Sequence, residues 1–204
     1  MISLIKRLFN GTPVTISPEQ QLADWHANGK PAPPPHIVKQ QVLQHYKNQY
    51  HLTVLVETGT YLGDMMEAQT PHFSQLYSIE LSEKLFKKAT NRFATNNKIT
   101  ILQGDSGKVL HTLVPQLNTA TLFWLDGHYS AGITAKGEKD CPIFEELEAI
   151  FATHLPHIVL VDDARLFVGQ GDYPTVAELT AFVESKKSGY DVFVEDDIIR
   201  ILPK

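Results

Sequence analysis

The sequence predicts an α/β protein with a doubly wound, mostly parallel seven-stranded sheet that ends in an antiparallel hairpin. Five short apolar runs alternate with helical patterns, and continuous apolar strands are typical of a parallel sheet covered on both faces. The tail adds two further strand patterns around a turn. Five strand–helix units and a hairpin are too few for an eight-fold barrel.

The individual elements follow from these patterns. The runs that predict parallel strands are 53–56, 76–79, 99–102, 121–125 and 158–161. Helical patterns follow four of these elements, with expected positions at 82–94, 106–114, from Pro142 onward, and 175–187. The predicted hairpin pairs 190–195 with 198–202 around Asp196-Asp197.

A proline-rich segment divides the chain. Three consecutive prolines, Pro33 to Pro35, are stiff, extended and without backbone donors. A helical pattern over 36–50 follows at once. We therefore predict an N-terminal extension, 1–33, and one α/β domain, 34–204. The first 50 residues are expected to shape a substrate pocket or to form a homodimer contact, and the sequence does not select between these roles.

Composition excludes several classes of protein. The 204 residues carry 18 basic and 23 acidic side chains, a net charge of -5, which argues against nucleic acid as the main partner. The single cysteine, Cys141, excludes an internal disulfide and a four-cysteine zinc site. It fits a reducing compartment, so a cytoplasmic location is expected. No apolar run has the roughly 18 residues of a membrane span.

Acidic residues follow one predicted strand after another. They are Glu57, Glu80, Asp105, Asp126, Asp162 and Asp163. In open parallel sheets the carboxyl ends of the strands form the ligand-binding edge. Because carboxylates repel one another, their gathering at one edge indicates a ligand rich in hydroxyl groups or a metal ion.

The loop after the first strand has features of an anion-binding turn. Gly59 and Gly63 permit a sharp turn, and a following helix offers free N–H groups. The loop lacks the G-x-G-x-x-G of dinucleotide folds and the lysine of a P-loop, and a plain tight turn explains it equally well. Glu80, at the end of the second strand, lies where ribose hydroxyls are bound in such sheets, or it starts the next helix.

Together these motifs resemble those of class I S-adenosylmethionine-dependent methyltransferases over residues 53–165. The resemblance is to small bacterial O-methyltransferases of the macrocin and catechol types. The matching motifs are Val56-Glu57-Thr58-Gly59-Thr60-Tyr61-Leu62-Gly63, Ser78-Ile79-Glu80, Gln103-Gly104-Asp105-Ser106 and Leu125-Asp126-Gly127-His128-Tyr129-Ser130.

The resemblance implies a Rossmann-like fold, S-adenosylmethionine as cofactor and a set of cofactor-binding residues. The first loop would hold the methionine part, Glu80 the ribose, and Asp105 with Ser106 the adenine. The full set that it implies is Glu57, Gly59, Thr60, Gly63, Glu80, Asp105, Ser106 and Asp126.

The resemblance also implies a Mg²⁺ site at Asp126, Asp162 and Asp163. Three carboxylates with water suit a hard octahedral cation. The alternative is that Asp126 contacts the cofactor and that the Asp162-Asp163 pair is a solvated turn. The chain departs from the catechol type in having Asp rather than Asn at 163, and no lysine base follows Asp126.

His128 is the candidate general base, with Asp126 as the second catalytic residue. An unperturbed histidine accepts a proton near neutral pH. The alternative is that His128 hydrogen-bonds the loop after the fourth strand. The following residues, 130–141, form a long glycine-containing loop that is predicted to be a substrate lid or a surface loop.

These observations predict a magnesium-assisted O-methyltransferase that acts on a small hydroxylated acceptor: a sugar, a polyol or a catechol-like molecule. The alternative is a non-catalytic domain that binds a nucleoside or a partner on the same fold. An NAD-linked enzyme is disfavoured because the dinucleotide motif is missing.

Overall fold

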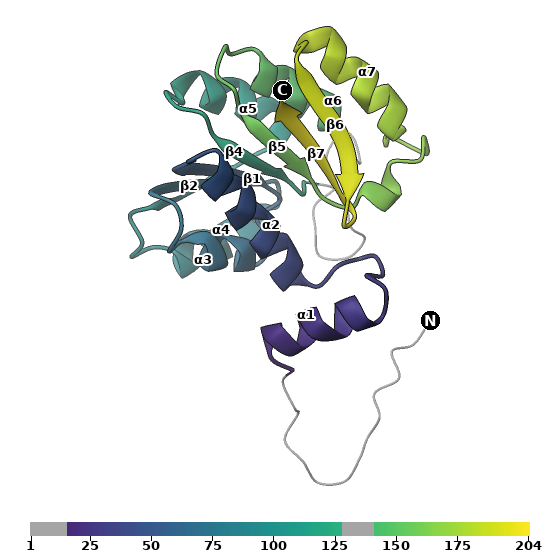
Figure 1. Ribbon diagram of the computed structural model, residues 1–204. Coiled ribbons are helices and arrows are strands. Elements are labelled where there is room, and N and C mark those ends of the chain that lie inside the picture. The colour runs from purple at the N-terminus through teal and green to yellow at the C-terminus, as the bar shows by residue number, and fades with distance from the viewer. Residues whose placement is uncertain (1–15, 128–140) are drawn as a thin grey trace, which may run out of the picture.

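A single mixed sheet organises the protein. The computed structural model describes residues 16–127 and 141–204. Its strands run in the order β3-β2-β1-β4-β5-β7-β6, with β1 to β5 parallel and β7 antiparallel to both neighbours (Figure 1). The strands are β1 Val54–Thr58, β2 Gln75–Glu80, β3 Ile99–Gln103, β4 Leu122–Leu125, β5 Ile158–Val161, β6 Tyr190–Glu195 and β7 Ile198–Pro203. The predicted fold class is confirmed.

The helices after the first cover the sheet from both sides, and the first lies beside the second (Figure 1). They are α1 Pro18–Ala27, α2 His36–Gln49, α3 Asp64–Gln69, α4 Glu83–Arg92, α5 Ser106–Leu113, α6 Ile143–Phe151 and α7 Val176–Lys186. Side chains cap the helices where the sequence predicts that they begin: Ser82 accepts from Leu85 N, Asp105 from Gly107 N and Thr175 from Glu178 N.

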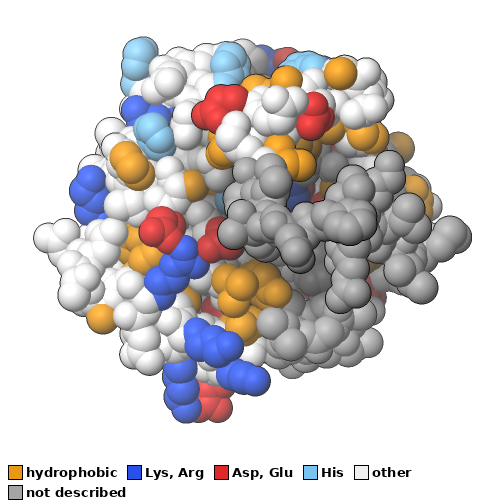
Figure 2. All heavy atoms as spheres, turned by 90° about the horizontal axis from the view of Figure 1, so that it is seen from below, with side chains coloured by type: hydrophobic (Ala, Val, Ile, Leu, Met, Phe, Trp, Pro, Cys, Tyr) orange, Lys and Arg blue, Asp and Glu red, His pale blue; other side chains and the backbone are white. Residues whose placement is uncertain are grey.

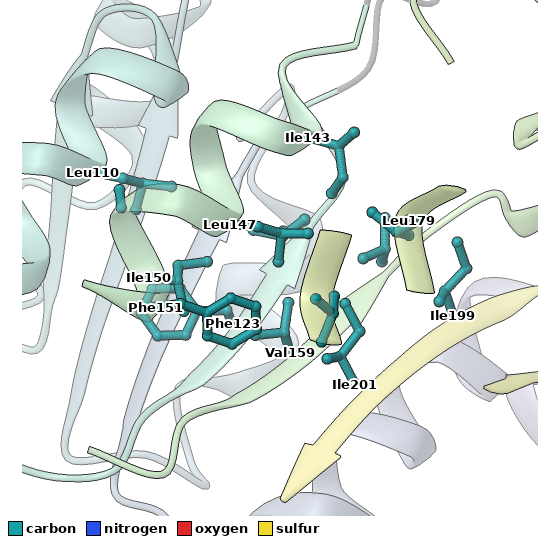
Figure 3. Close-up of a cluster of buried hydrophobic side chains, with 14 of the residues drawn as sticks. Leu110, Phe123, Ile143, Leu147, Ile150, Phe151, Val159, Leu179, Ile199 and Ile201 are labelled. Carbon is teal, nitrogen blue, oxygen red and sulfur yellow. The ribbon is translucent and has the colours of Figure 1, made fainter. Parts of the chain in front are cut away.

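Two apolar clusters lie on opposite faces of the sheet because alternate residues of each strand point to opposite sides. One cluster joins Phe123 and Val159 of the sheet to α5, α6 and α7, and Figure 3 shows Leu147 and Ile150 of α6 packed against these strands. In the other cluster, Trp124 of the sheet packs with residues of α2 and α3. Burial on both faces is the physical reason that the central strands are continuously apolar.

The strand order reverses next to β1. β1 pairs with β2 on one side and with β4 on the other, so chain connections diverge from this point. Such a switch point leaves a crevice at the carboxyl ends of the strands. The β6–β7 turn reaches the same edge, because Ala164 N, just after β5, donates to Asp197 O at 2.9 Å.

Helix α1 lies within the predicted N-terminal extension and was not predicted. Trp25 is its one buried residue, and Trp25 Nε1 donates to Pro31 O at 2.8 Å. Lys30 forms an ion pair with Asp196 in the β6–β7 turn at 3.1 Å. The division at residues 33 and 34 stays a prediction. Among the described residues no helix has the length and apolarity that crossing a bilayer requires.

Candidate active site

Glu57 on β1 lies opposite Ser78 on β2, and both side chains are buried. Ser78 Oγ donates to Glu57 Oε2, while Ser78 Oγ and Thr60 Oγ1 lie 2.6 Å apart. Burial raises the pKa of Glu57 to about 8, against the opposing effect of the Ser78 hydrogen bond. Glu57 is therefore mostly neutral at pH 7 and ties the loop after β1 to β2 through hydroxyl groups. A direct contact with the cofactor stays a prediction.

Glu80 connects two loops at the carboxyl edge. Its Oε2 accepts from Tyr61 N at 2.8 Å and its Oε1 accepts from Ser82 N at 2.8 Å. The first bond fixes the loop after β1, and the second fixes the start of α4. Each oxygen retains a lone pair for a further donor such as a ribose hydroxyl.

Gly59 allows the loop after β1 to meet the end of β4. Its φ is +85°, and a Cβ there would lie 2.3 Å from the backbone oxygen of Asp126. Gly63 has a φ of +86° and directly precedes α3. At both positions the backbone conformation and close packing require glycine. The two glycines therefore serve a tight turn, which was the alternative to an anion-binding loop.

The predicted adenine-side residues lie at the start of α5. Asp105 Oδ1 accepts from Gly107 N at 3.0 Å, and Ser106 is the first residue of the helix. A buried acid that the sequence analysis missed lies nearby: Glu146 on α6. Burial raises the pKa of Glu146 to about 7, although the hydroxyls of Ser106 and Thr58 oppose the shift. Glu146 therefore holds a proton much more readily than an exposed carboxyl does, and it lies beside Ser106 of α5 and Thr58 of β1.

Asp126, Asp162 and Asp163 converge at the ends of β4 and β5. One carboxylate oxygen of each lies within 4.8 Å of the others. Asp163 adopts a left-handed backbone conformation, with φ of +57°, and its N–H donates to Asp162 Oδ1 at 2.9 Å. The tight turn thus points two successive carboxylates toward Asp126.

Helix α2 delivers a cation to this acidic cluster. Lys39 Nζ forms an ion pair with Asp162 Oδ2 and lies 3.9 Å from Asp163 Oδ1, with 15% of its side chain exposed. Burial alone would lower the pKa of Lys39, but attraction to the carboxylates, above all that of Asp162, outweighs it and raises this pKa. Lys39 is therefore charged at neutral pH.

Arg165 adds a second positive charge at the outer side of the cluster. Its NH1 lies 2.8 Å from Asp163 Oδ1 and also forms an ion pair with Asp197 of the β6–β7 turn. Arg165 is thereby a partner of two acids at this edge of the sheet.

The cluster remains short of positive charge despite these two cations. Burial raises the pKa of Asp126 well above its usual value, repulsion from Asp162 adds to the shift, and Lys39 opposes it. Burial also raises the pKa of Asp162. An added cation would relieve this repulsion, and carboxylate oxygens are the donors that Mg²⁺ prefers. The three residues therefore fit a divalent ion.

The predicted acids thus lie at the carboxyl edge of one sheet. Two further ionisable residues near them, Lys39 and Glu146, were not predicted from the sequence. Lys39 shares a helix face with Val42 and Leu43, and Glu146 shares one with Ile143 and Ile150. A charged residue on an otherwise apolar face was the available signal in each case. His128 and residues 130–140 of the predicted lid, 130–141, lie outside the described residues.

The fold is that of class I methyltransferases. No model of a protein family matches the sequence, and no curated protein matches it. Among solved structures, the O-methyltransferase from Bacillus cereus in complex with S-adenosylhomocysteine (SAH) has a TM-score of 0.59 at 14% identity, over 91% of this chain and 90% of that one.

Two further structures have the same fold. The O-methyltransferase TomG from Streptomyces achromogenes, involved in tomaymycin synthesis and bound to S-adenosylmethionine, has a TM-score of 0.55 at 14% identity, covering 92% of this chain and 88% of that one. The SAH-bound methyltransferase PaMTH1 from Podospora anserina has a TM-score of 0.55 at 15% identity, covering 92% and 86%. At these identities the likeness establishes the fold.

Proposed function

We propose that the chain is an S-adenosylmethionine-dependent O-methyltransferase that acts on a small hydroxylated acceptor. The observation that carries the proposal is the convergence of acids from β1, β2, β4 and β5 on one edge of a sheet with the class I methyltransferase fold. Solved structures of this fold that hold SAH or S-adenosylmethionine support the same cofactor here.

Each part of the cofactor has a proposed set of partners. The loop of Gly59, Thr60 and Gly63 and the start of α3 would hold the zwitterionic methionine part. The free lone pairs of Glu80 would accept from the ribose diol, and Asp105 with Ser106 would bound the adenine. The protein then aligns an acceptor oxygen with the sulfonium methyl group and excludes water. In the transfer the sulfur–carbon bond breaks, a carbon–oxygen bond forms and the acceptor hydroxyl loses its proton.

Asp126, Asp162 and Asp163 would hold Mg²⁺ beside the acceptor hydroxyl. When bound, the ion supplies Lewis-acid activation of that hydroxyl. His128 is the proposed acceptor of the proton, with water as the alternative. Asp126 lies next to the loop after β1 through Gly59, so it also links the cofactor half of the site to the acidic cluster.

A small acceptor is favoured over nucleic acid by the charge of the molecule. The net charge is -5, and on the face seen in Figure 2 basic side chains lie interspersed with acidic and apolar ones. Binding a phosphate backbone requires a continuous basic surface. A sugar, a polyol or a catechol-like molecule is therefore the proposed acceptor class.

Binding and turnover measurements test the proposal. We expect calorimetric titration to show SAH binding, and fluorescence titration with NADH to show none. We expect Asp162→Asn to abolish methyl transfer from labelled S-adenosylmethionine to a panel of sugars, polyols and catechols, with SAH affinity nearly unchanged. SAH binding without methylated product on the whole panel would favour the non-catalytic alternative. Turnover that persists in strong chelator would remove the metal from the mechanism.

A further inference from the structure

We propose that Lys39 is a tethered cation of the acidic cluster, and that a divalent metal ion must displace it from Asp162 in order to bind there. The inference rests on the proposed function and its metal site. It assigns to a residue of α2 the control of metal affinity, which the carboxylates alone do not determine.

The hydrogen bonds of Asp162 place the two cations in competition. Asp162 is fully buried. Its Oδ1 already accepts from Asp163 N at 2.9 Å, and its Oδ2 is held by Lys39 Nζ. Each oxygen keeps a second lone pair, but the ammonium group already lies against Oδ2, so a metal ion bound to this oxygen would lie beside it.

A metal ion and the ammonium group cannot share this oxygen without strong repulsion. Lys39 Nζ is paired with Asp162 Oδ2 and lies 3.9 Å from Asp163 Oδ1. The three ligand oxygens of the cluster span no more than 4.8 Å, since all lie within that distance of one another. A divalent ion inside that span would sit within a few ångströms of a positive charge that burial shields from solvent. Metal binding therefore requires Lys39 to leave.

The side chain can leave without movement of the helix. Val38 and Leu43 of α2 are buried in the protein and hold the backbone in place. The four-carbon stem of lysine has several rotatable bonds, and its ammonium group is readily hydrated once outside the cluster. Loading of the metal thus exchanges one cation for another in a site whose backbone stays fixed.

Titration of the full-length chain with Mn²⁺ tests the exchange, with free Mn²⁺ followed by electron paramagnetic resonance. Lys39→Met removes the competing charge and keeps a side chain of similar length. We expect its dissociation constant for Mn²⁺ to fall at least about tenfold below that of the wild type, because the ion no longer displaces an ammonium group. Lys88→Met, an exposed lysine on α4, makes the same change in net charge and is expected to leave the affinity unchanged.

A second variant and a thermal measurement keep the test valid if Lys39→Met is unstable without metal. Lys39→Gln, which can still donate to Asp162, is expected to show the same direction, and Mn²⁺ should raise the melting temperature of either Lys39 variant more than that of the wild type. A variant with merely loosened packing would bind Mn²⁺ more weakly, so the sign of the change separates the two explanations.

The outcomes distinguish this inference from the proposed function. Equal or weaker Mn²⁺ affinity in both Lys39 variants overturns the inference and leaves the metal site standing. Absence of Mn²⁺ binding in every variant overturns the inference and the metal site together. SAH affinity, measured on the same samples, reports separately on the proposed methyltransferase.

Discussion

Glu80 shows how one residue can serve the fold and a ligand together. Both of its oxygens accept backbone N–H groups, from Tyr61 and from Ser82, and these bonds fix the loops on either side of the proposed ribose site. The remaining lone pairs are thereby oriented before a ligand arrives. Preorganised acceptors lose little conformational entropy on binding.

Replacement of Glu80 by glutamine tests this role. Glu80→Gln keeps the size of the side chain but removes its charge and one acceptor oxygen. We expect SAH to bind about tenfold or more weakly, since hydrogen bonds to a charged group contribute about 1.5–3 kcal/mol. Glu83→Gln, at an exposed position of α4, is the matched control. Equal SAH affinity in Glu80→Gln and wild type, measured by calorimetry, would refute the ribose assignment.

At the scale of single residues, the sequence predicts the site residues that belong to a recognisable motif and does not predict the others. The acids after the strands were predicted because strand ends are readable. Lys39 and Glu146 were not predicted, because their partners come from distant elements: Lys39 meets Asp162, and Glu146 meets Ser106. Only the folded chain brings these pairs together.

At the scale of elements, the junction of β1 with β4 decides the shape of the site. Asp126 N donates to Thr58 O at 3.1 Å, and Gly59 packs directly against the backbone of Asp126. The loop after β1 and the acid after β4 therefore keep a fixed separation. Any side chain at position 59 would push them apart.

Alanine substitutions at two glycines separate crowding from backbone strain. Gly59→Ala places a Cβ 2.3 Å from Asp126 O at a φ of +85°, whereas Gly171→Ala meets nothing within 4 Å at a φ of +62°. We expect Gly171→Ala to lower the free energy of unfolding by about 1 kcal/mol and Gly59→Ala by about 2–4 kcal/mol, with loss of SAH binding. Urea denaturation measures both, and equal losses would show that crowding at Gly59 is relieved elsewhere.

The elements that the sequence predicted are those with a strong hydrophobic periodicity or with clear capping and turn residues at their ends. The five parallel strands, the hairpin around Asp196 and the helices that follow a capping residue were confirmed. Helix α1 was missed because it is polar nearly all round, with only Trp25 buried, so its sequence has no apolar stripe. Its position depends on contacts with Pro31 and with the β6–β7 turn, which are not readable locally.

At the scale of the whole molecule, the sheet buries ionisable groups that tie stability to pH. The pKa of Glu57 is raised to about 8 and that of Glu146 to about 7, chiefly by burial. The pKa of His157 is lowered to about 4, also by burial. Well above pH 6.5, the ordinary pKa of histidine, His157 is neutral in the folded and the unfolded chain, so the acids dominate there.

Glu57 gives the sharpest prediction in that range. Its pKa is 4.5 in the unfolded chain and about 8 in the folded one, so its stabilising effect is full below pH 4.5 and is lost as the pH rises through 8. We expect the wild type to lose about 1–2 kcal/mol more unfolding free energy between pH 6.5 and pH 8 than Glu57→Gln, which keeps the hydrogen bond to Ser78 without a titrating group. Urea denaturation in the presence of chelator measures the difference. Parallel pH profiles for the two proteins would show that Glu57 is ionised in the folded state, and the buried hydroxyl network would then have to stabilise a charge.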